Sequence, residues 1–460
     1  MTDLIDCDLL VFGAGMAGLS AAAWAAEAGA RVIVVEKQAA PGGSALLSGG
    51  VTWTIQSPDK LNAHTRGRPE LGAVVADGYA EGLAWLRRRG MVLSPALAVL
   101  RGQGYQIDIV AHVRDCIATI EAAGGHVALG STARALTRDA SGRVCGAVVE
   151  HADGDLEIAS SWTLLATGGY QADPELRARH IHPNARAMRL RSNPASDGGG
   201  LRLGLGAGGA FVDDNSGFYG HLVTASPEWG DPRLYTVLSQ YHSDAALLLN
   251  EQGERFCDES EGDHVNTWEV LRQTNARALL VWDDRVQQDH VLTPFIEVAP
   301  PMDKLAVALQ RGGDGAVAAS LDEVAAFAGA HGFDAARTRG TLAEYSRLQR
   351  EGWEQLRPRR VENHGPMDRA PYYVLIVHPA ITYTFGGLAI DPQARVLDPA
   401  GRPVPGLLAA GADAGDVYRV GYAGGLAQAL TLGLRAVRSA GFGPAPADSP
   451  SELCLYRSSI

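Results

Sequence analysis

A glycine-rich turn near the start of the chain has the residue types and spacing that bind a pyrophosphate. Residues 13–18 read Gly-Ala-Gly-Met-Ala-Gly, and a glutamate follows at position 36. Gly13 permits a tight turn, Gly15 lets the backbone approach a phosphate, and Gly18 lets the following helix pack closely on a strand. Glu36 can accept hydrogen bonds from both hydroxyls of an adenosine ribose, and it would repel a 2′-phosphate. The spacing therefore predicts a dinucleotide site.

The elements expected on either side of this turn match that chemistry. The apolar run Leu9 to Phe12 predicts a first strand, Met16 to Ala28 an Ala-rich helix, and Arg31 to Val35 a second strand. The N-terminus of the helix would offer unpaired N–H groups and a partial positive charge to the phosphates. A strand, a glycine turn, a helix and a strand that ends in an acid form the full context of the motif. The alternative is an ordinary glycine-rich turn in an α/β core.

Length and composition narrow the class of protein. The chain has 460 residues, which predicts two or three domains, and its hydrophobic content of 46% allows a buried interior. The formal net charge of -12 argues against a nucleic-acid or anionic-membrane partner. The charged start, Met1 to Asp8, does not fit a signal peptide, and no apolar run is long enough to span a bilayer. Five scattered cysteines without a CxxC pair indicate reduced thiols. We expect a cytoplasmic protein with no metal site that acts on a small molecule and passes electrons to an unknown acceptor.

The loop after Glu36 extends the cofactor site. It contains the glycine doublets Gly42-Gly43 and Gly49-Gly50, each close to a serine. A nicotinamide enzyme does not need them, whereas a longer, rigid cofactor that threads through the protein does. This loop resembles that of the FAD-binding family of fumarate reductases, succinate dehydrogenases and ketosteroid dehydrogenases, in which it passes under the flavin. Respiratory members carry a flavin-linking histidine here, but residues 45–47 are Ala-Leu-Leu. The resemblance therefore implies FAD that is bound non-covalently.

Three later segments are similar to the same family. Residues 166–169 read Ala-Thr-Gly-Gly after an apolar strand, a turn that returns to the FAD phosphates in the family. Asp197-Gly198 opens a glycine-spaced helix, and the family has a similar pair near the flavin. Gly411-Ala412-Asp413 ends a late strand and precedes a helix over 424–440, whose N-terminus faces the flavin pyrimidine in the family. The resemblance covers residues 6–440 and is weakest in the middle of the chain.

The FAD-binding residues that the motif and the resemblance imply come from separate segments of the chain. They are Gly13, Gly15, Met16, Ala17, Gly18, Glu36, Lys37, Gly42, Gly43, Ser44, Ser48, Gly49, Gly50, Ala133, Thr167, Gly168, Asp197, Gly198, Gly411, Asp413, Gly425, Leu426 and Ala427.

The resemblance and the element pattern together predict an α/β fold. We expect a Rossmann-like FAD-binding domain, of the glutathione-reductase type, with an inserted α+β cap domain. The FAD-binding domain would comprise residues 1–212 and 366–460, and the cap residues 213–365, where strand signals thin out. The further elements predicted are helices at 70–90, 108–124 and 320–330, a loop at 101–106, an antiparallel meander at 126–159, and strands at 162–166, 381–390, 395–397 and 407–411.

In this family the substrate lies between cap and flavin, and one cap motif implies a proton-transfer residue. The stretch Asn250 to Glu259 is similar to a family motif, and the family places its proton-transfer residue four positions after the final acid. This chain has Asp263 there, followed by His264. Either is a candidate general base if its surroundings raise the carboxyl pKa or set the imidazole tautomer. The alternative is an acidic, exposed loop.

Tyr422 is the candidate that would bind a substrate carbonyl. It lies two residues before the doublet Gly424-Gly425, where fumarate reductases have a carboxylate-binding arginine. Ketosteroid dehydrogenases have a similar tyrosine there, whose hydroxyl and a nearby backbone N–H hold the substrate carbonyl oxygen. A phenol and an amide N–H are suitable donors for a developing enolate. The alternative is an aromatic side chain that only supports the flavin.

Four other side chains are candidates for substrate binding. Tyr383 occupies the place of a carboxylate-binding histidine of fumarate reductases. His221 lies one residue away from the place of another such histidine, and Tyr219 stands close to it in the sequence. Arg419 could bind an anion or pair with an acid of the cap.

These residues lead to three hypotheses of function. The first is an FAD-dependent dehydrogenase that desaturates a carbonyl compound, ketosteroid-like or another cyclic ketone or acid. Tyr422 would polarise the carbonyl, Asp263 or His264 would take the α-proton, and flavin N5 would take the β-hydride. The second is the reverse reaction, reduction of an activated alkene as in fumarate reductases. The third is a non-catalytic flavin-binding protein.

Overall fold

The computed structural model describes residues 5–152, 154–212, 216–224, 237–293, 302–362 and 364–443. Its helices are α1 Met16–Glu27, α2 Pro58–Thr65, α3 Pro69–Arg88, α4 Ile109–Ala122, α5 Pro174–His180, α6 Gly199–Gly206, α8 Asp263–Leu271, α9 Asp284–Val286, α10 Lys304–Gln310, α11 Leu321–Ala330, α12 Ala335–Glu351 and α13 Gly425–Ser439. Its strands are β1 Ile5–Phe12, β2 Val32–Glu36, β3 Val51–Thr54, β4 Leu97–Val99, β5 Gly102–Gln106, β6 His126–Leu129, β7 Thr132–Arg138, β8 Val144–His151, β9 Gly154–Leu165, β10 Arg189–Leu190, β11 Phe218–Thr224, β12 Leu247–Leu249, β13 Ala278–Asp283, β14 Gly315–Ala318, β15 Tyr372–Thr384, β16 Arg395–Leu397 and β17 Pro403–Ala409.

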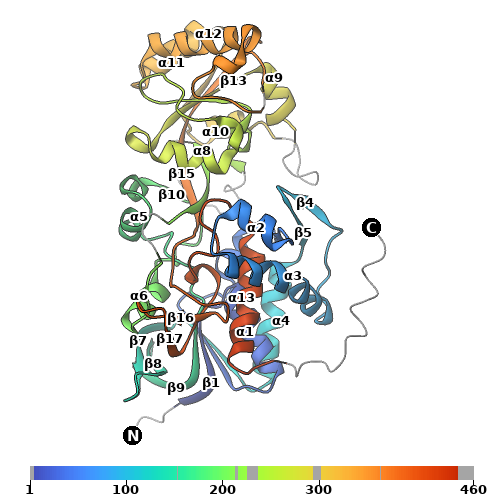
Figure 1. Ribbon diagram of the computed structural model, residues 1–460, viewed down its shortest axis with the longest axis vertical. Coiled ribbons are helices and arrows are strands. Elements are labelled where there is room, and N and C mark those ends of the chain that lie inside the picture. The colour runs from blue at the N-terminus through green and yellow to red at the C-terminus, as the bar shows by residue number, and fades with distance from the viewer. Residues whose placement is uncertain are drawn as a thin grey trace.

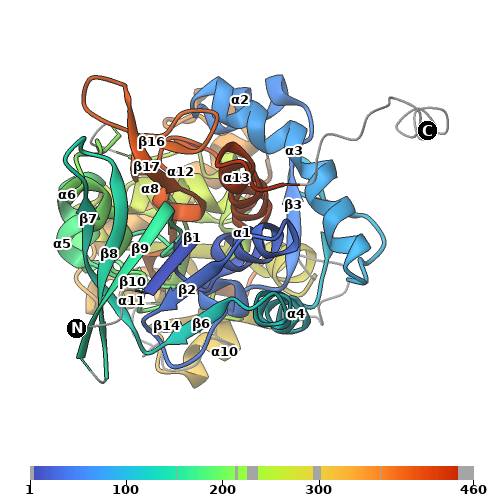
Figure 2. The same ribbon diagram turned by 90° about the horizontal axis from the view of Figure 1, so that it is seen from below.

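The first sheet carries the predicted dinucleotide motif. Its strand order is β16-β17-β9-β1-β2-β6, and β1 pairs in parallel with both β2 and β9. Leu9, Leu10 and Val11 are fully buried, as expected for a parallel strand covered on both faces. Helices α1, α3, α4 and α13 lie beside this sheet in the lower half of the molecule (Figures 1 and 2). The strand, turn, helix and strand predicted over residues 9–35 are confirmed.

The second sheet lies in the upper half of the molecule, next to α8, α10, α11 and α12 (Figure 1). Its strand order is β10-β15-β13-β12, and β11 and β14 also pair with β15. The thirteen-residue β15 is therefore its central strand. β10 and β15 lie outside residues 213–365, the segment expected to form the cap. The second sheet therefore contains strands from the segments before and after it. Apolar clusters pack on the sheet, with Leu279, Val281 and Val374 fully buried in one of them.

Several predicted elements differ from the structure. The loop expected at 101–106 is wrong, because residues 102–106 form β5 and pair with β3 in a small third sheet. The meander expected at 126–159 is correct for β7, β8 and β9, but β6 pairs in parallel with β2 instead. The strand expected at 162–166 is the end of the same β9.

The later predictions are also partly wrong. The strand expected at 381–390 begins at Tyr372 and ends at Thr384, and β11 to β14 are strands in a region where few were expected. The helix at 320–330 is confirmed, and the Ser320 hydroxyl caps it by accepting the Glu323 N–H at 3.3 Å. Helices α3 and α4 match their predicted ranges. The turn residue Asp153, Cys454 and the tail after Pro444 lie outside the described residues.

Across the described ranges, none of the helices combines the length and the apolar character that a membrane span requires.

Candidate active site

A cavity of about 580 Å³ runs past the carboxyl ends of β1, β2 and β9 and continues to the N-terminus of α13. Its volume is in the range typical of cofactor sites, and the carboxyl edge of a parallel sheet is where such folds bind nucleotides. Gly13, Gly15, Met16 and Ala17 line it at the glycine turn. Other predicted FAD residues that line it are Glu36, Lys37, Gly43, Ser44, Ser48, Ala133, Thr167, Gly168, Asp197, Gly411, Gly425 and Leu426.

The backbone of the glycine turn fits a pyrophosphate. A Cβ atom on Gly18 would lie 1.9 Å from the Gly13 carbonyl oxygen, and one on Gly13 would lie 2.2 Å from the Ala166 carbonyl oxygen. Both glycines are therefore required for helix α1 and β9 to pack against the turn. A Cβ on Gly15 would meet only the Gly42 carbonyl oxygen, at 3.9 Å. The cavity side of the turn is open where a phosphate would approach the N-terminus of α1.

Glu36 is held at the wall of the cavity. Its carboxylate accepts the Ala14 N–H at 2.8 Å and the Gln38 N–H at 2.9 Å. Each oxygen of a carboxylate has a second lone pair, which suits the two hydroxyls of a ribose. The ammonium of Lys37 pairs with Asp197 at 2.8 Å, so these two FAD candidates contact each other beside Glu36.

Some of the predicted FAD residues do not line the cavity, but Asp413 supports segments that do. Asp413 is buried and accepts the Thr167 N–H at 2.5 Å and the Gly169 N–H at 3.2 Å. It thereby joins the turn after β9 to the segment after β17. The predicted residues that do not line the cavity are Gly18, Gly42, Gly49, Gly50, Gly198, Asp413 and Ala427.

The sequence reasoning missed other polar residues of the lining. Asn193 donates to the Gln38 side chain at 2.6 Å, and both residues line the cavity. Gln38 directly follows Glu36 and Lys37, so the sequence could have indicated it. Asn193 belongs to no motif that we recognised. Ser131, Gln171, Ser196 and Arg202 are further polar residues of the lining.

Tyr422 closes the far end of the cavity, at the start of α13. Its hydroxyl oxygen accepts the N–H of Gly425 at 2.6 Å. Within the described part of the chain, the hydroxyl hydrogen of Tyr422 has no acceptor of its own, and Tyr422 lines the cavity. The ring stacks on Tyr219, with 3.7 Å between ring centroids. Burial raises the pKa of Tyr422 to about 12, so the phenol keeps its proton at neutral pH.

Tyr383 and Arg419 have hydrogen-bond partners within the protein. The Tyr383 hydroxyl donates to the side-chain oxygen of Gln428, and Gln428 donates to the Gly411 carbonyl at 3.0 Å. Tyr383 still lines the cavity. Arg419 makes a forked contact with Asp416, both of whose oxygens lie 3.0 Å from one guanidinium nitrogen. This partner acid lies on the same loop as Arg419.

Asp263 and His221 form a buried pair between α8 and β11. The Asp263 carboxyl contacts His221 Nδ1 and also accepts the Leu222 N–H at 3.3 Å and the Ser243 hydroxyl at 3.4 Å. Burial raises the pKa of Asp263 to about 7 and lowers that of His221 well below its ordinary value. The ring of Tyr219 lies 4.8 Å from that of His221. Tyr219 therefore connects this pair with Tyr422.

His264 contacts the loop that carries Tyr422. Its Nε2 donates to the Val420 carbonyl at 2.8 Å, which leaves Nδ1 as the basic nitrogen. Nδ1 is buried and has no hydrogen-bond partner in the described ranges. Burial lowers the pKa of His264 to about 4, so the imidazole is neutral at pH 7. A buried acceptor without a donor calls for an explanation. His264 does not belong to the described lining of the cavity.

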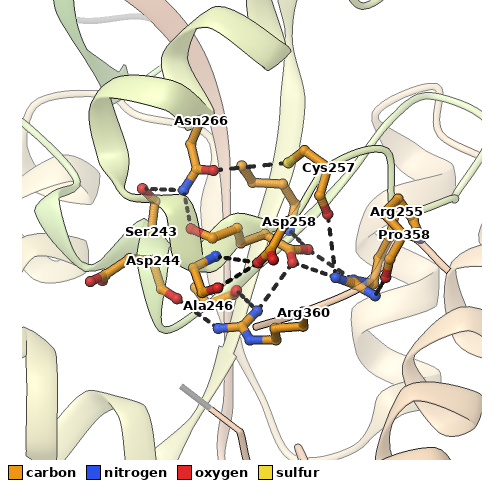
Figure 3. Close-up of polar contacts among 12 residues, drawn as sticks. Ser243, Asp244, Ala246, Arg255, Cys257, Asp258, Asn266, Pro358 and Arg360 are labelled. Carbon is orange, nitrogen blue, oxygen red and sulfur yellow. Dashed lines mark hydrogen bonds and ion pairs between the residues drawn. The ribbon is translucent and has the colours of Figure 1, made fainter. Parts of the chain in front are cut away.

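The motif before Asp263 forms a buried ion network rather than an exposed loop. Arg255 and Arg360 converge on one region (Figure 3), where both donate to the carboxylate of Glu259, at 2.6 and 3.1 Å. The same carboxylate accepts the N–H of Leu248 on β12 at 3.3 Å. The side chains of Glu259 and Arg360 are 0% exposed. Asp263 is also nearly buried, with 9% of its side chain exposed. The acidic-loop alternative is therefore wrong for these two acids, although Glu261 is exposed.

Arg191 is a further cationic residue that the sequence did not indicate, and it lies near Tyr241 and Tyr383. Arg191, which is 8% exposed, follows β10 and donates to the Thr382 hydroxyl at 2.9 Å and to the Tyr241 hydroxyl at 3.1 Å. Thr382 lines the cavity next to Tyr383. Arg191 lies in no recognised motif, and its partners come from distant segments, so nothing in the sequence marked it.

The fold and this cavity define a flavoprotein with a parallel-sheet dinucleotide site. The family model described as "FAD binding domain" matches residues 8–426. The chain therefore belongs to this family, and its cofactor is FAD.

Two relatives and one solved structure are similar to this chain. The chain is 26% identical to "Fumarate reductase (cytochrome)" of Shewanella frigidimarina, over 93% of this chain and 75% of that protein. It is 28% identical to "Urocanate reductase" of Eggerthella lenta, over 89% of this chain and 70% of that protein. The 3-ketosteroid-Δ4-(5α)-dehydrogenase of Rhodococcus jostii RHA1 has a similar fold, with a TM-score of 0.72 and 21% identity, over 96% of this chain and 97% of that chain. The predicted relation to fumarate reductase flavoproteins is confirmed, as is the class, an FAD-dependent oxidoreductase acting on CH–CH bonds. The ketosteroid dehydrogenase shares the fold.

Proposed function

We propose that this protein is an FAD-dependent dehydrogenase that introduces a double bond next to the carbonyl group of its substrate. The observation that carries the proposal concerns Tyr422, which lines the cavity. Its hydroxyl accepts the Gly425 N–H and has no acceptor for its own hydrogen among the described residues. FAD, when bound, supplies the acceptor for the hydrogen that leaves the β-carbon as a hydride. The two residues that act on the carbonyl and the α-proton are then Tyr422 and His264.

Tyr422 would donate its hydrogen bond to the carbonyl oxygen of the substrate. Negative charge builds on that oxygen as the α-proton leaves, and a donor placed there in advance stabilises it. The N-terminus of α13 adds a partial positive charge at the same place. A neutral phenol is suited to a carbonyl, whereas a carboxylate is bound better by a guanidinium.

His264 is the proposed acceptor of the α-proton, through Nδ1. Geometry favours it over Asp263, because its Nδ1 is unoccupied by any described group while the Asp263 carboxyl is engaged by His221, Leu222 and Ser243. The contact of Nε2 with Val420 holds the neutral tautomer that has its lone pair on Nδ1. Asp263 would act on His264 through its charge, since an ionised carboxylate makes the neighbouring imidazole a stronger base.

We further propose that FAD is bound non-covalently and that the unit around the second sheet caps the substrate. In support of the first point, the described lining of the cavity contains neither histidine nor cysteine. In support of the second, α8 brings His264 from that unit to Val420 on the FAD-binding side. We propose the boundaries 1–212, 213–365 and 366–460 for the domains. β10 lies in the first of these segments and β15 in the third, and the two strands pair with each other. A cytoplasmic location also remains an expectation.

The second candidate is the reverse reaction, reduction of an activated alkene. The names of the two relatives, a fumarate reductase and a urocanate reductase, favour it. The same residues would then serve in reverse, with His264 donating the proton. Tyr422 at the place of the fumarate reductase arginine argues against a dicarboxylate as the substrate.

The test is an anaerobic screen for bleaching of the bound flavin. Cyclic ketones, steroids and oxo acids are mixed with the oxidised holoenzyme, and fumarate and urocanate with the reduced holoenzyme. We expect at least one saturated carbonyl compound to bleach the flavin and to yield the α,β-unsaturated product. Rapid reoxidation by an alkene, without bleaching by any carbonyl compound, would favour the reductase. Absence of both reactions would leave the non-catalytic flavoprotein as the better hypothesis.

A further inference from the structure

Gln428 fixes the direction in which the Tyr383 hydroxyl forms its hydrogen bond. Gln428 lies on α13 and is fully buried, and its side-chain nitrogen donates to the Gly411 carbonyl at 3.0 Å. A backbone carbonyl can only accept, so the amide nitrogen must face Gly411 and the amide oxygen must face Tyr383. The Tyr383 hydroxyl therefore donates its one hydrogen to Gln428. Towards any other group, the Tyr383 oxygen can act only as an acceptor.

The hydroxyl of Tyr422 has the opposite polarity. Its oxygen accepts the Gly425 N–H at 2.6 Å, and its own hydrogen has no acceptor among the described residues. Burial raises the pKa of Tyr422 to about 12 and that of Tyr383 well above its ordinary value, so both phenols keep their hydrogens at neutral pH. One phenol therefore offers a hydrogen-bond donor, and the other offers an acceptor.

The two phenols lie on either side of the N-terminus of α13. Both residues line the cavity, as does Gly425, the first residue of this helix. The ring centroids of Tyr383 and Tyr422 lie 6.0 Å apart. A Cβ atom on Gly425 would lie 2.9 Å from the Tyr422 hydroxyl oxygen and 3.5 Å from two ring carbons of Tyr383. A polar group of a ligand that lies beside Gly425 would therefore meet both phenols.

This polarity selects among the polar groups that a ligand can place there. A ketone has only acceptor lone pairs, so it satisfies Tyr422 but presents nothing that Tyr383 can accept. Two facing acceptors form no hydrogen bond, and a buried acceptor without a donor costs free energy. A group that carries an N–H or O–H next to its carbonyl oxygen satisfies both phenols. Amides and carbonyl compounds with an adjacent hydroxyl group have this pattern.

We propose that Tyr383 determines specificity by accepting a hydrogen bond from the substrate, and that the substrate therefore carries an N–H or O–H donor next to the carbonyl group that Tyr422 binds. The place of that carbonyl rests on the proposed function, whereas the acceptor role of Tyr383 rests on its contact with Gln428. Gln428 is a positioning residue, since it is fully buried and acts through Tyr383. Tyr383 would thus differ from the carboxylate-binding histidine that fumarate reductases have at this place, because its hydrogen is already bonded within the protein.

The test compares two ligands of the same shape by the change that each causes in the flavin absorbance of the oxidised holoenzyme. Benzamide carries N–H donors next to its carbonyl, and acetophenone has a methyl group in their place. Neither has the pair of saturated α- and β-carbons that desaturation requires, so binding is measured without turnover. We expect benzamide to bind the parent protein about tenfold more tightly than acetophenone, the scale for one hydrogen bond.

Two variants separate the acceptor from the residue that positions it. Tyr383→Phe removes the acceptor, and we expect the preference for benzamide to vanish while acetophenone binds as it does to the parent. Gln428→Met frees the hydrogen of Tyr383, which can then be donated to a ligand carbonyl, so acetophenone should bind more tightly than it does to the parent. The Gly411 carbonyl keeps the Ala414 N–H in this variant. Tyr105→Phe, on β5 and outside the described lining of the cavity, is the matched control and should keep the parental preference.

Several outcomes would overturn the inference. They are a parent protein that binds no benzamide or does not prefer it, a parental preference in Tyr383→Phe, or equal losses for both ligands in both variants. A changed absorbance of the unliganded flavin in Tyr383→Phe, with the preference kept, would also overturn it by assigning the acceptor to the flavin. Gln428→Met keeps the test valid if Tyr383→Phe fails to fold. Because binding requires no turnover, a protein that prefers benzamide but desaturates no carbonyl compound would refute the proposed function and leave the role of Tyr383 intact.

Discussion

The hydroxyl oxygen of Tyr422 and the backbone N–H of Gly425 lie 2.6 Å apart. Gly425 is the first residue of α13, so the phenol stands on the positive end of a fifteen-residue helix. By accepting this N–H, the phenol oxygen is polarised, and its own hydrogen becomes a better donor. The contact therefore suits an oxygen on which negative charge develops.

Glu36 should decide whether FAD stays bound. Glu36→Arg removes the acceptors for the ribose hydroxyls, and we expect most of the flavin to be lost on purification. Flavin content is measured from absorbance after gel filtration, and unchanged occupancy would count against the role of Glu36. Denaturation of the parent protein should release all of its FAD into the supernatant; flavin that precipitates with the polypeptide would contradict non-covalent binding.

His264 and Asp263 should differ in their effect on the rate. We expect His264→Ala to slow substrate-driven flavin reduction by about 10²-fold or more, the usual scale for a lost general base. Asp263→Asn should cost less, because Asp263 acts through His264. His126→Ala, an exposed histidine on β6, is the matched control. A larger loss in Asp263→Asn would make the carboxylate the base, and parental rates in both variants would exclude both residues.

The pH dependence should report the ionisation of Asp263. Burial raises its pKa to about 7, so the carboxyl is neutral below that pH and charged above it. The charged form strengthens His264 as a base, and we expect the rate of flavin reduction to rise as the pH passes through about 7. Asp263→Asn should lack this rise and retain only the fall towards pH 4, where His264 protonates. A rise near pH 7 that survives in Asp263→Asn would assign it to another group.

The buried ion network should be important for stability. Glu259→Gln leaves Arg255 and Arg360 without their shared carboxylate, and we expect the free energy of unfolding to fall by about 3–5 kcal/mol. Glu261→Gln changes an exposed acid two residues away and should stay within about 0.5 kcal/mol of the parent. Urea titration of the two variants provides the comparison. Equal stabilities would mean that the network contributes little.

The FAD half of the site could be predicted because its chemistry is local in the sequence. Gly13, Gly18 and Glu36 act within one strand, turn and helix, so their spacing alone indicates their roles. The segment 101–106 was misjudged for a related reason. Gly102 and Gly104 are typical of loops, yet a Cβ on Gly104 would lie 2.3 Å from the Cβ of Trp53. There glycine allows two strands to approach closely, which the sequence pattern does not reveal.

The substrate half depends on contacts between distant segments. Arg191, Tyr241 and Thr382 come together from three separate segments and share no motif. His221 was noticed only through an offset match, and the pairing of β11 with β15 shifts its register between Tyr219 and Gly220. Its partner Asp263 lies forty-two positions away in the chain. Only the three-dimensional arrangement distinguishes such a pair from two isolated side chains.

The most direct test of the central claim is the rate of flavin reduction by a carbonyl substrate in Tyr422→Phe. The variant should keep its FAD and its fold, because the ring contacts of Tyr422 remain. Loss of an oxyanion donor costs about 2.7–4 kcal/mol in well-studied enzymes, so we expect the rate to fall on the order of 10²-fold, while the control Tyr105→Phe reacts like the parent. Fumarate should be a poor oxidant of the reduced protein. A parental rate in Tyr422→Phe, together with rapid oxidation by fumarate, would contradict the dehydrogenase and favour the reductase.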